Sequence, residues 1–487
     1  MFRAGPSSRR LSLAGLALTL LASGCTVGPD FKRPALPDGA GYTKAAPTAA
    51  EAGGVAQAFV PGADLPGQWW TLYQSPALNR LVEAALKANP DIEAAQAALR
   101  SAHQSYLAQR GAFLPTVDLS GDATRLKASG ALSPPLSTSQ LQFNLYNAQV
   151  AVGFTPDVFG AIRRQTEAVA AQAEAQRFAT EATYLTLTAN VVTAAIQAAG
   201  LKDQIEAART AIRDEREVLE LMRRQQALGQ VSGGDVAAQE TLLAQAEQVL
   251  PPLDKQLTQT LDQLAALTGR SPAEALDEVV DLNAMSLPAA MPVSLPAKLV
   301  EQRPDIRIAE ANLHAASAEV GVAIAARLPN LSLSATAGGA STDIGKLLNQ
   351  PNSFWTIGAG LTQPIFEGGA LYHKQKAAEA TLDQARAQYR STVISALQNV
   401  ADSLGALKAD ADAQNAADRA EHAARASFTI AKKQFELGDA SRVALLNAEQ
   451  AYQQALLARA QARANRYADT AALFEALGGG WWNRTET

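Results

Sequence analysis

The chain has 487 residues, a formal net charge of −5, 47% hydrophobic residues and 18% charged residues. This length allows two or more ordinary domains, and the composition excludes both a disordered chain and a multi-span helical membrane protein. Beyond the N-terminal leader, no run approaches the ~20 consecutive apolar residues of a membrane helix. The acidic balance also argues against nucleic acid as a partner.

Residues 1–24 are predicted to be a secretory signal peptide, because three arginines precede an apolar stretch that ends in small residues. The pair Arg9-Arg10 hints at the twin-arginine route, but the remainder of that motif is poor, which favours the general secretory route. Loss of this leader, with Arg3, Arg9 and Arg10, lowers the net charge from −5 to −8.

Cys25 is the only cysteine and directly follows Ser23-Gly24, so the leader resembles a bacterial lipobox in which Cys25 becomes the lipidated N-terminus. A stray cysteine in a plain signal peptide is the alternative. Thr26 stands where an aspartate would retain a lipoprotein in the inner membrane, so this resemblance implies the outer membrane. With one cysteine, no intrachain disulfide can form.

Two segments of the chain repeat each other. One opens with Asn89-Pro90-Asp91-Ile92 and ends at Pro115, and the other opens with Arg303-Pro304-Asp305-Ile306 and ends at Pro329. The spacing from the first proline to the last is 25 residues in both, and an alternating segment and a long Ala/Gln-rich stretch follow. An internal repeat limits the architecture, so we predict two structural repeats at 76–268 and 298–477.

The remaining segments are assigned by composition. Residues 25–75 are rich in Pro, Gly and Ala and are predicted to be a lipidated, extended tether that wraps a neighbour or the body of the protein. Residues 269–297 are predicted to be a connecting equatorial segment, and 478–487 a C-terminal tail.

Polar and apolar residues alternate at 116–124, 140–154, 331–337 and 355–362, with a shift of phase near Asn147-Ala148. Alternation with period two predicts strands, which we place in hairpins at 114–155 and 329–365. Their length suits a membrane barrel, whereas ordinary strands in a soluble sheet are the alternative. Four strands cannot close a membrane barrel, so strands that enter a bilayer require an oligomer.

Long helices are predicted between the strands. A first helix covers about 76–111, and proline-free runs from Ala161 to Leu228 and from Gly369 to Leu437 each predict about 100 Å of helix, or two shorter helices end to end. Returning helices are expected at 235–268 and 441–477. Two small-residue stripes on the second run favour a closed wall of helices over a simple antiparallel coiled-coil hairpin.

The whole mature chain resembles the TolC-like outer membrane factors of the lipoprotein (NodT-type) branch. The resemblance is carried by Cys25 to Pro34, Gln68-Trp69-Trp70, Asn89 to Ile92, and the two stretches Pro156-Asp157-Val158-Phe159-Gly160 and Gln363-Pro364-Ile365-Phe366. It implies an α+β membrane protein whose four strands per chain form a trimeric 12-stranded outer-membrane β-barrel continuous with a long periplasmic α-helical barrel. The implied partners are a periplasmic adaptor and an inner-membrane efflux pump in a Gram-negative bacterium.

The same resemblance implies two sets of working residues. The pairs Leu228-Gly229 and Leu437-Gly438, where glycine can end a helix, are predicted helix-tip contacts for the adaptor. The periplasmic aperture candidates are Asp235, Asp439, Arg442 and Asn447. The family often has aspartates where this chain has Ala444 and Asn447, so strong cation selectivity is not expected. Helix capping is the alternative role of Asp235.

The sequence shows no sign of an enzyme. Its four histidines are scattered without metal-ligand spacing, and no phosphate-binding loop or nucleophile motif is present. We therefore expect no cofactor, no metal and no catalysis, and a channel that passes drugs or other small compounds outward. A non-channel periplasmic coiled-coil scaffold or adaptor lipoprotein is the alternative.

Overall fold

The computed structural model describes residues 26–35, 42–43, 49–127, 142–274 and 280–484. Its chain divides into two compact units. The strand unit comprises Met1–Pro34, Leu99–Gln176 and Ala309–Tyr389, and the helical unit comprises Ala35–Ala98, Arg177–Ile308 and Arg390–Thr487. Cys25 and the predicted signal peptide lie outside the described residues.

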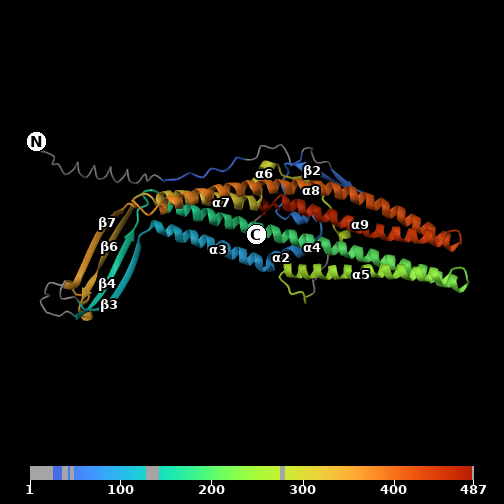
Figure 1. The fold of residues 1–487 in the computed structure, drawn as a ribbon, viewed down its shortest axis with the longest axis horizontal. Coiled ribbons are helices and arrows are strands. Elements are labelled where there is room, and N and C mark those ends of the chain that lie inside the picture. The colour runs from blue at the N-terminus through green and yellow to red at the C-terminus, as the bar shows by residue number, and fades with distance from the viewer. Residues whose placement is uncertain (1–25, 36–41, 44–48, 128–141, 275–279, 485–487) are drawn as a thin grey trace. The chain divides into compact units, whose positions relative to one another are not determined.

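A four-stranded sheet with the order β3-β4-β6-β7 forms the strand unit's β structure (Figure 1). The strands are β3 (Thr116–Lys127), β4 (Gln142–Phe154), β6 (Asn330–Ser341) and β7 (Ser353–Thr362). All neighbouring strands are antiparallel, and the register runs without interruption along each pair. All four strands lie within the segments predicted as hairpins, and β4 and β6 join the two hairpins.

The sheet has one apolar and one polar face. Leu119, Val150, Ala337 and Trp355 stand opposite one another in a single row across the four strands. Leu119 is 81% exposed and Trp355 74% exposed. The adjacent row, on the other face, consists of Asp118, Ala151, Thr336 and Thr356. Among the described residues, therefore, none covers this apolar face.

The alternation of polar and apolar residues in β4 changes phase near Asn147. This change is not caused by a β-bulge, because the register of β4 with β3 is continuous through Asn147. Side chains alternate strictly between faces in such a ladder. Phe143 and Leu145 consequently lie on the same face as Ala151, so the apolar band of β4 is confined to 148–154. This band covers roughly 20 Å at about 3.4 Å per residue.

The start of the described chain is fixed on the strand unit. Arg164, whose side chain is 4% exposed, donates hydrogen bonds to the Val27 carbonyl (3.0 Å) and to Asp30 (2.6 Å). Phe31 stacks on His314 with ring centroids 4.3 Å apart. The tether was expected to wrap either a neighbouring molecule or the body of the protein. Residues 27–31 lie on the body of their own chain.

The second part of the predicted tether contains regular structure. Residues 50–61 form β1 (Ala50–Ala52) and β2 (Val55–Pro61), which join β5 (Ala290–Val293) in a three-stranded sheet of the helical unit. The buried Arg466 explains why this segment forms strands, because its guanidinium donates hydrogen bonds to the carbonyls of Ala50, Ala52 and Val55. This cation lies far away in the sequence, so the local Pro/Gly/Ala composition did not reveal the strands.

Two long and two returning helices have equal lengths in the two halves. The long helices α4 (Ala161–Ala227) and α8 (Ala370–Glu436) each have 67 residues. The returning helices α5 (Gly233–Leu267) and α9 (Arg442–Ala476) each have 35 residues. In the helical unit, α5 runs back along α4 and α9 back along α8, so both turns lie at the same end (Figure 1).

The first predicted helix is divided in two, which corrects the expected single helix at 76–111. It consists of α2 (Pro76–Ala88) and α3 (Pro90–Arg110), and the second half has the corresponding pair α6 (Pro296–Gln302) and α7 (Pro304–Ala325). Proline disfavours helical geometry in the residue before it, and Asn89 and Arg303 are both extended.

The residue before each Pro-Asp-Ile motif also caps a returning helix. Asn89 donates to the Leu267 carbonyl at the end of α5 (2.9 Å), and Arg303 donates to the Ala476 carbonyl at the end of α9 (2.8 Å). The last carbonyls of a helix have no partner within the helix. The repeated motif thus fastens the returning helix of each half at its C-terminal end.

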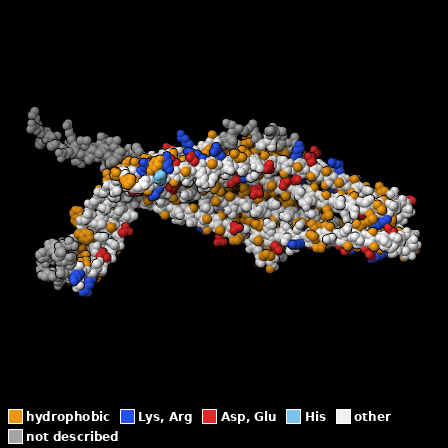
Figure 2. Space-filling model, in the orientation of Figure 1, with side chains coloured by type: hydrophobic (Ala, Val, Ile, Leu, Met, Phe, Trp, Pro, Cys, Tyr) orange, Lys and Arg blue, Asp and Glu red, His pale blue; other side chains and the backbone are white. Residues whose placement is uncertain are grey.

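One described helix, α4, contains a stretch long and apolar enough to cross a membrane, but 67% of that stretch is buried inside the protein. It is therefore a core helix. On the face shown in Figure 2, lysine, arginine, aspartate and glutamate are interspersed with apolar side chains along the helices and form no single charged patch.

Candidate functional site

The two helix tips have the same backbone geometry. Gly229 follows α4 with a φ of +73°, and Gly438 follows α8 with a φ of +84°. The next residue in each case bonds back to the helix, Gln230 to the Gln225 carbonyl (2.9 Å) and Asp439 to the Gln434 carbonyl (2.8 Å). A left-handed residue with this bond ends a helix sharply and favours glycine. The Leu-Gly pairs therefore make the two turns.

The first residues of the returning helices differ between the tips. Ser232 and Asp235 form a capping box at the start of α5, in which the Asp235 carboxylate accepts from the Ser232 backbone (3.0 Å) and hydroxyl (2.7 Å). These hydrogen bonds lower the pKa of Asp235. At the start of α9, Ser441 accepts from the backbone of Ala444 (3.2 Å), which cannot reciprocate.

An apolar cluster holds all four helices together near the tips. Its buried members are Val218, Leu219 and Met222 of α4, Val236 of α5, Phe428, Ala431 and Phe435 of α8, and Leu445, Ala448 and Tyr452 of α9. Leu228 and Leu437, by contrast, are 74% and 78% exposed at the turns themselves. Leu228 and Leu437 are therefore exposed at turns whose helices are held together by the apolar cluster.

The aperture candidates do not form one network. Asp439 and Asn447 are exposed, whereas the Arg442 side chain is only 10% exposed. Arg442 Nη1 lies 3.5 Å from Glu449 Oε2. The Asp235 carboxylate accepts its hydrogen bonds from Ser232, and within the described residues it forms no ion pair with Arg442. The charges of Asp235 and Arg442 still influence each other's pKa.

Two buried glutamates at the tips escaped the sequence analysis. Glu215 of α4 is 2% exposed and Glu449 of α9 is 3% exposed. Burial raises the pKa of Glu215 to about 7 and that of Glu449 to about 8. Glu215 occupies a seam position in the series Ala208, Ile212, Glu215, Leu219 and Met222, whose other members are buried and apolar. A charged residue within an otherwise apolar helix stripe is a signal by which the sequence could have revealed Glu215.

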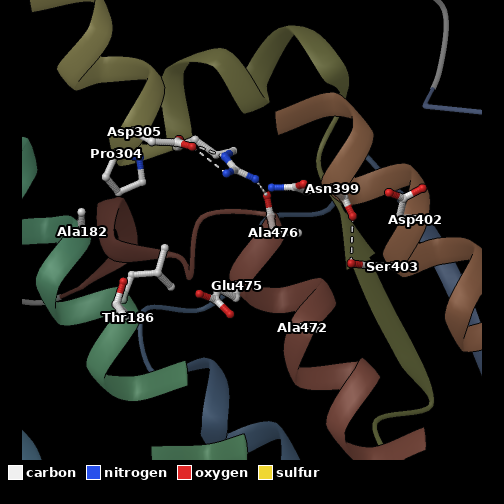
Figure 3. Close-up of a pocket in the computed structure, with 12 residues that line it drawn as sticks. Ala182, Thr186, Pro304, Asp305, Asn399, Asp402, Ser403, Ala472, Glu475 and Ala476 are labelled. Atoms are coloured by element: carbon white, nitrogen blue, oxygen red, sulfur yellow. Dashed lines mark hydrogen bonds and ion pairs between the residues drawn. The ribbon is translucent and has the colours of Figure 1, made fainter. Parts of the chain in front are cut away.

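A polar recess of about 460 Å³ lies in the helical unit where α4, α7, α8 and α9 meet (Figure 3). Asn399, Asp402 and Glu475 contribute to its wall, and burial raises the pKa of Glu475. Arg303 bonds there to Asp305 (2.6 Å) and to the end of α9. Because its cation is engaged in these contacts, we assign the recess a structural role in joining helix ends.

Three histidines, His103, His314 and His373, lie next to aromatic side chains. His314, for example, stacks on Phe31 and lies 2.8 Å from Glu167. Across the described residues, His, Cys, Asp and Glu side chains form no group of three that could hold a metal ion.

A sheet with an uncovered apolar face, in a chain with long paired helices, defines the class of outer-membrane channel proteins with a periplasmic helical part. The chain belongs to the family described as outer membrane efflux protein, which matches residues 81–270 and 295–479. It is thus the outer-membrane component of an efflux system, and it extends into the periplasm.

Individual relatives agree over nearly the full length. The chain is 29% identical over 477 residues to the pyoverdine export outer membrane protein OpmQ of Pseudomonas putida, covering 97% of this chain and 98% of that protein. It is 30% identical over 477 residues to the solvent efflux pump outer membrane protein SrpC of Pseudomonas putida, covering 96% and 98%.

Solved structures share the fold. The outer-membrane channel OprN has a TM-score of 0.85 at 27% identity, covering 94% of this chain and 100% of that chain. The outer membrane protein VceC of Vibrio cholerae has a TM-score of 0.79 at 26% identity, covering 85% and 100%.

Proposed function

We propose that three copies of this chain form a 12-stranded barrel in the outer membrane, continued by a periplasmic α-helical tunnel through which small compounds leave the cell. The observation that carries this proposal is the sheet itself. In the described chain, β3 and β7 are edge strands with no partner on their outer sides. Unpaired strand edges are not tolerated in a bilayer, so the edges must be closed by other copies.

The strand directions support this closure. Every neighbouring pair in the order β3-β4-β6-β7 is antiparallel, so β7 of one copy would meet β3 of the next in the antiparallel sense as well. Repetition of the same contact produces a closed ring of even strand number, as membrane barrels require. The row of Leu119, Val150 and Trp355 would then face lipid, and the row of Asp118 and Thr336 would face the lumen.

The tips are proposed as the docking site for the periplasmic adaptor, which connects the channel to an inner-membrane pump. Leu228 and Leu437 are exposed on turns fixed by Gly229 and Gly438, and an exposed leucine on a rigid turn can insert into an apolar pocket of a partner. Asp235, Asp439, Arg442 and Asn447 are proposed to line the aperture, with Asp235 as its capped carboxylate.

Cys25 is proposed as the lipid anchor. The nearby Val27, Gly28 and Asp30 are tied to Arg164, which would hold the acylated N-terminus beside the strand unit. The relatives OpmQ and SrpC are named for pyoverdine export and solvent efflux. We propose small organic compounds as the class of cargo, and no catalytic step in this chain.

The deciding experiment measures mass and conductance on one sample. The lipidated chain is extracted in detergent, its protein mass is determined by light scattering, and it is then inserted into a planar bilayer. A trimer with discrete conductance steps is the expected result. A monomer that remains soluble without detergent, or a trimer that never conducts, would favour the periplasmic scaffold instead.

The adaptor site has its own test. Leu228→Asp with Leu437→Asp should abolish chemical cross-linking to an adaptor in cells, while the protein still assembles and conducts in bilayers. The matched control is Leu348→Asp, an 88% exposed leucine of the strand unit. Undiminished cross-linking of the tip variant would place the adaptor elsewhere.

A further inference from the structure

Glu215 connects three helices at the tips. Its carboxylate accepts hydrogen bonds from Gln239 of α5 and from Gln453 of α9. Gln239 is fully buried, and Glu215 is 2% exposed. α4 and α5 form the first helix pair, whereas α9 belongs to the second pair. Glu215 is therefore a polar contact between the two pairs.

Glu449 and Arg442 of α9 complete the cluster. The Arg442 guanidinium nitrogens and both Glu449 carboxylate oxygens are buried, and within the described residues they make no hydrogen bond. Their closest approach is 3.5 Å. A buried ion pair without supporting hydrogen bonds recovers little of the free energy spent on desolvating its charges.

Charge balance makes this cluster sensitive to protons. The Arg442 guanidinium pairs with Glu449 and also acts through its charge on Glu215, so the cluster carries a net negative charge when both carboxylates are ionised. Burial raises the pKa of Glu215 to about 7, and Gln239 and Arg442 oppose this shift. Burial, with Glu215 as the next cause, raises the pKa of Glu449 to about 8, and Arg442 opposes this. The Glu215 carboxylate thus disfavours ionisation of Glu449.

The sign of the effect follows from linkage. Both carboxyls have higher pKa values in the packed junction than the ordinary value of 4.5, so the packed form binds protons more tightly than an opened, hydrated form. Their contribution to the packed form is complete below pH 4.5. It is lost as the pH rises through about 7 for Glu215 and about 8 for Glu449.

We propose that Glu215, Glu449 and Arg442 form a pH-responsive junction, which holds the first helix pair against the second in acid and loosens above neutral pH. This proposal rests on the channel function only for its consequence, a change in the periplasmic aperture. The junction itself is a property of contacts within one chain.

Other charges face the junction from α4, α5 and α8. They are Asp214 of α4, Asp235 of α5 and Lys432 of α8. Burial raises the pKa of Asp214, which reinforces the same direction. Asp235 has a lowered pKa because of Ser232, so it stays ionised throughout the neutral range. Arg442 stays charged as well. The response near pH 7–8 therefore belongs to the two glutamates.

The test measures the distance between the helix pairs directly. Nitroxide labels are attached to Leu228→Cys and Leu437→Cys, both exposed at the turns, in the full-length protein in nanodiscs. The unsubstituted chain, with Cys25 as its one cysteine, gives the background. Double electron–electron resonance is then recorded from pH 5.5 to pH 9.

We expect the distance distribution to move to longer values with a midpoint between pH 7 and 8. Glu215→Gln with Glu449→Gln should hold the short distances across the whole range, since neither side chain can ionise. The matched control is Glu240→Gln. Glu240 lies at the position in α5 that corresponds to Glu449 in α9, but it is exposed and paired with Arg223 at 2.9 Å. This control should keep the full response.

Three results would overturn the proposal: distances that do not change with pH in the parent, an unchanged response in the double glutamine variant, or an equal loss in the Glu240→Gln control. Conductance recorded on the same samples separates this inference from the proposed function. A protein that never conducts would refute the channel and leave the distance measurement valid.

Discussion

The helix pairs α4/α5 and α8/α9 have equal lengths but use corresponding charges differently. In the first pair, Arg223 of α4 and Glu240 of α5 form an exposed ion pair at 2.9 Å. The corresponding residues of the second pair are Lys432 and Glu449. Lys432 reaches across to Glu217 of α4 at 2.8 Å, and Glu449 turns inward to Arg442.

This difference shows how a duplicated sequence can build an asymmetric tip. The Arg223–Glu240 ion pair lies on the solvent-exposed surface of the first pair, where ion pairs contribute little. In the second pair, Lys432 contacts the first pair, and Glu449 is buried beside Arg442 within α9, where its charge is desolvated. Hence the second returning helix, α9, is where changes of sequence should have the larger effects.

The largest effect is expected at Arg466 of α9, which is 1% exposed and bonds the carbonyls of β1 and β2. Arg466→Met leaves several buried carbonyls unpaired and should destabilise the helical unit by about 3–5 kcal/mol. Thermal unfolding and proteolysis near residues 50–61 measure this. Arg459→Met, which loses an exposed pair with Asp418, should change stability by less than about 1 kcal/mol. Equal losses would contradict the special position of Arg466.

The second effect compares corresponding apolar residues of the returning helices. Leu445 of α9 is 0% exposed and Val236 of α5 is 8% exposed in the same cluster. Leu445→Ala should destabilise the tips by about 2–4 kcal/mol, whereas Val236→Ala should cost about 1–2 kcal/mol. Denaturant unfolding in detergent provides both values. A larger loss for Val236→Ala would mean that α5 is the central helix of the cluster.

The third effect concerns the two serine caps. Ser232→Ala removes one side of a reciprocal capping box and should cost about 1–2 kcal/mol, while Ser441→Ala should cost about 0.5–1 kcal/mol. Amide hydrogen exchange in the first turns of α5 and α9 reports each cap separately. Equal protection losses in the two turns would show that the Asp235 carboxylate adds nothing to the first cap.

The smallest effect sharpens the same comparison through pH. The pKa of Asp235 is lowered by Ser232, so its contribution to the first cap is present above pH 3.8 and is lost as the pH falls through its lowered value. The first turn of α5 should then lose protection in acid while the first turn of α9, with Ala444 in the corresponding position, does not. Ala444→Asp should introduce the acid-sensitive behaviour into α9. An unchanged α9 in that variant would show that the turn geometry, and not the missing carboxylate, separates the tips.

Much of the fold could be predicted from local patterns. The alternation at 331–337 and 355–362 located β6 and β7, and the proline-free runs located α4 and α8 to within a residue or two of their ends. These signals are local, because strand alternation and helix termination depend on neighbouring residues. The break between α2 and α3 was also readable from Asn89-Pro90, but the helical pattern on both sides outweighed it.

The family could also be reached from the sequence, and the comparisons confirm it. The order and spacing of short motifs, from Gln68-Trp69-Trp70 to Gln363-Pro364-Ile365-Phe366, led to the outer membrane efflux proteins. The aperture residues proposed by that resemblance remain predictions. Asp235 and Arg442 illustrate the difficulty, because the structure assigns them to different contacts.

The sequence by itself determined the four strands of the larger sheet, the long and returning helices, the two turns and the family, because turns and periodicities are properties of neighbouring residues. Only the tertiary structure decided that β1 and β2 form around Arg466, that Asn89 and Arg303 cap helices far along the chain, and that Glu215 and Glu449 are buried. These outcomes depend on burial and on partners more than a hundred residues away. A charge acquires a shifted pKa only where packing removes its water, and that packing is absent from any local pattern.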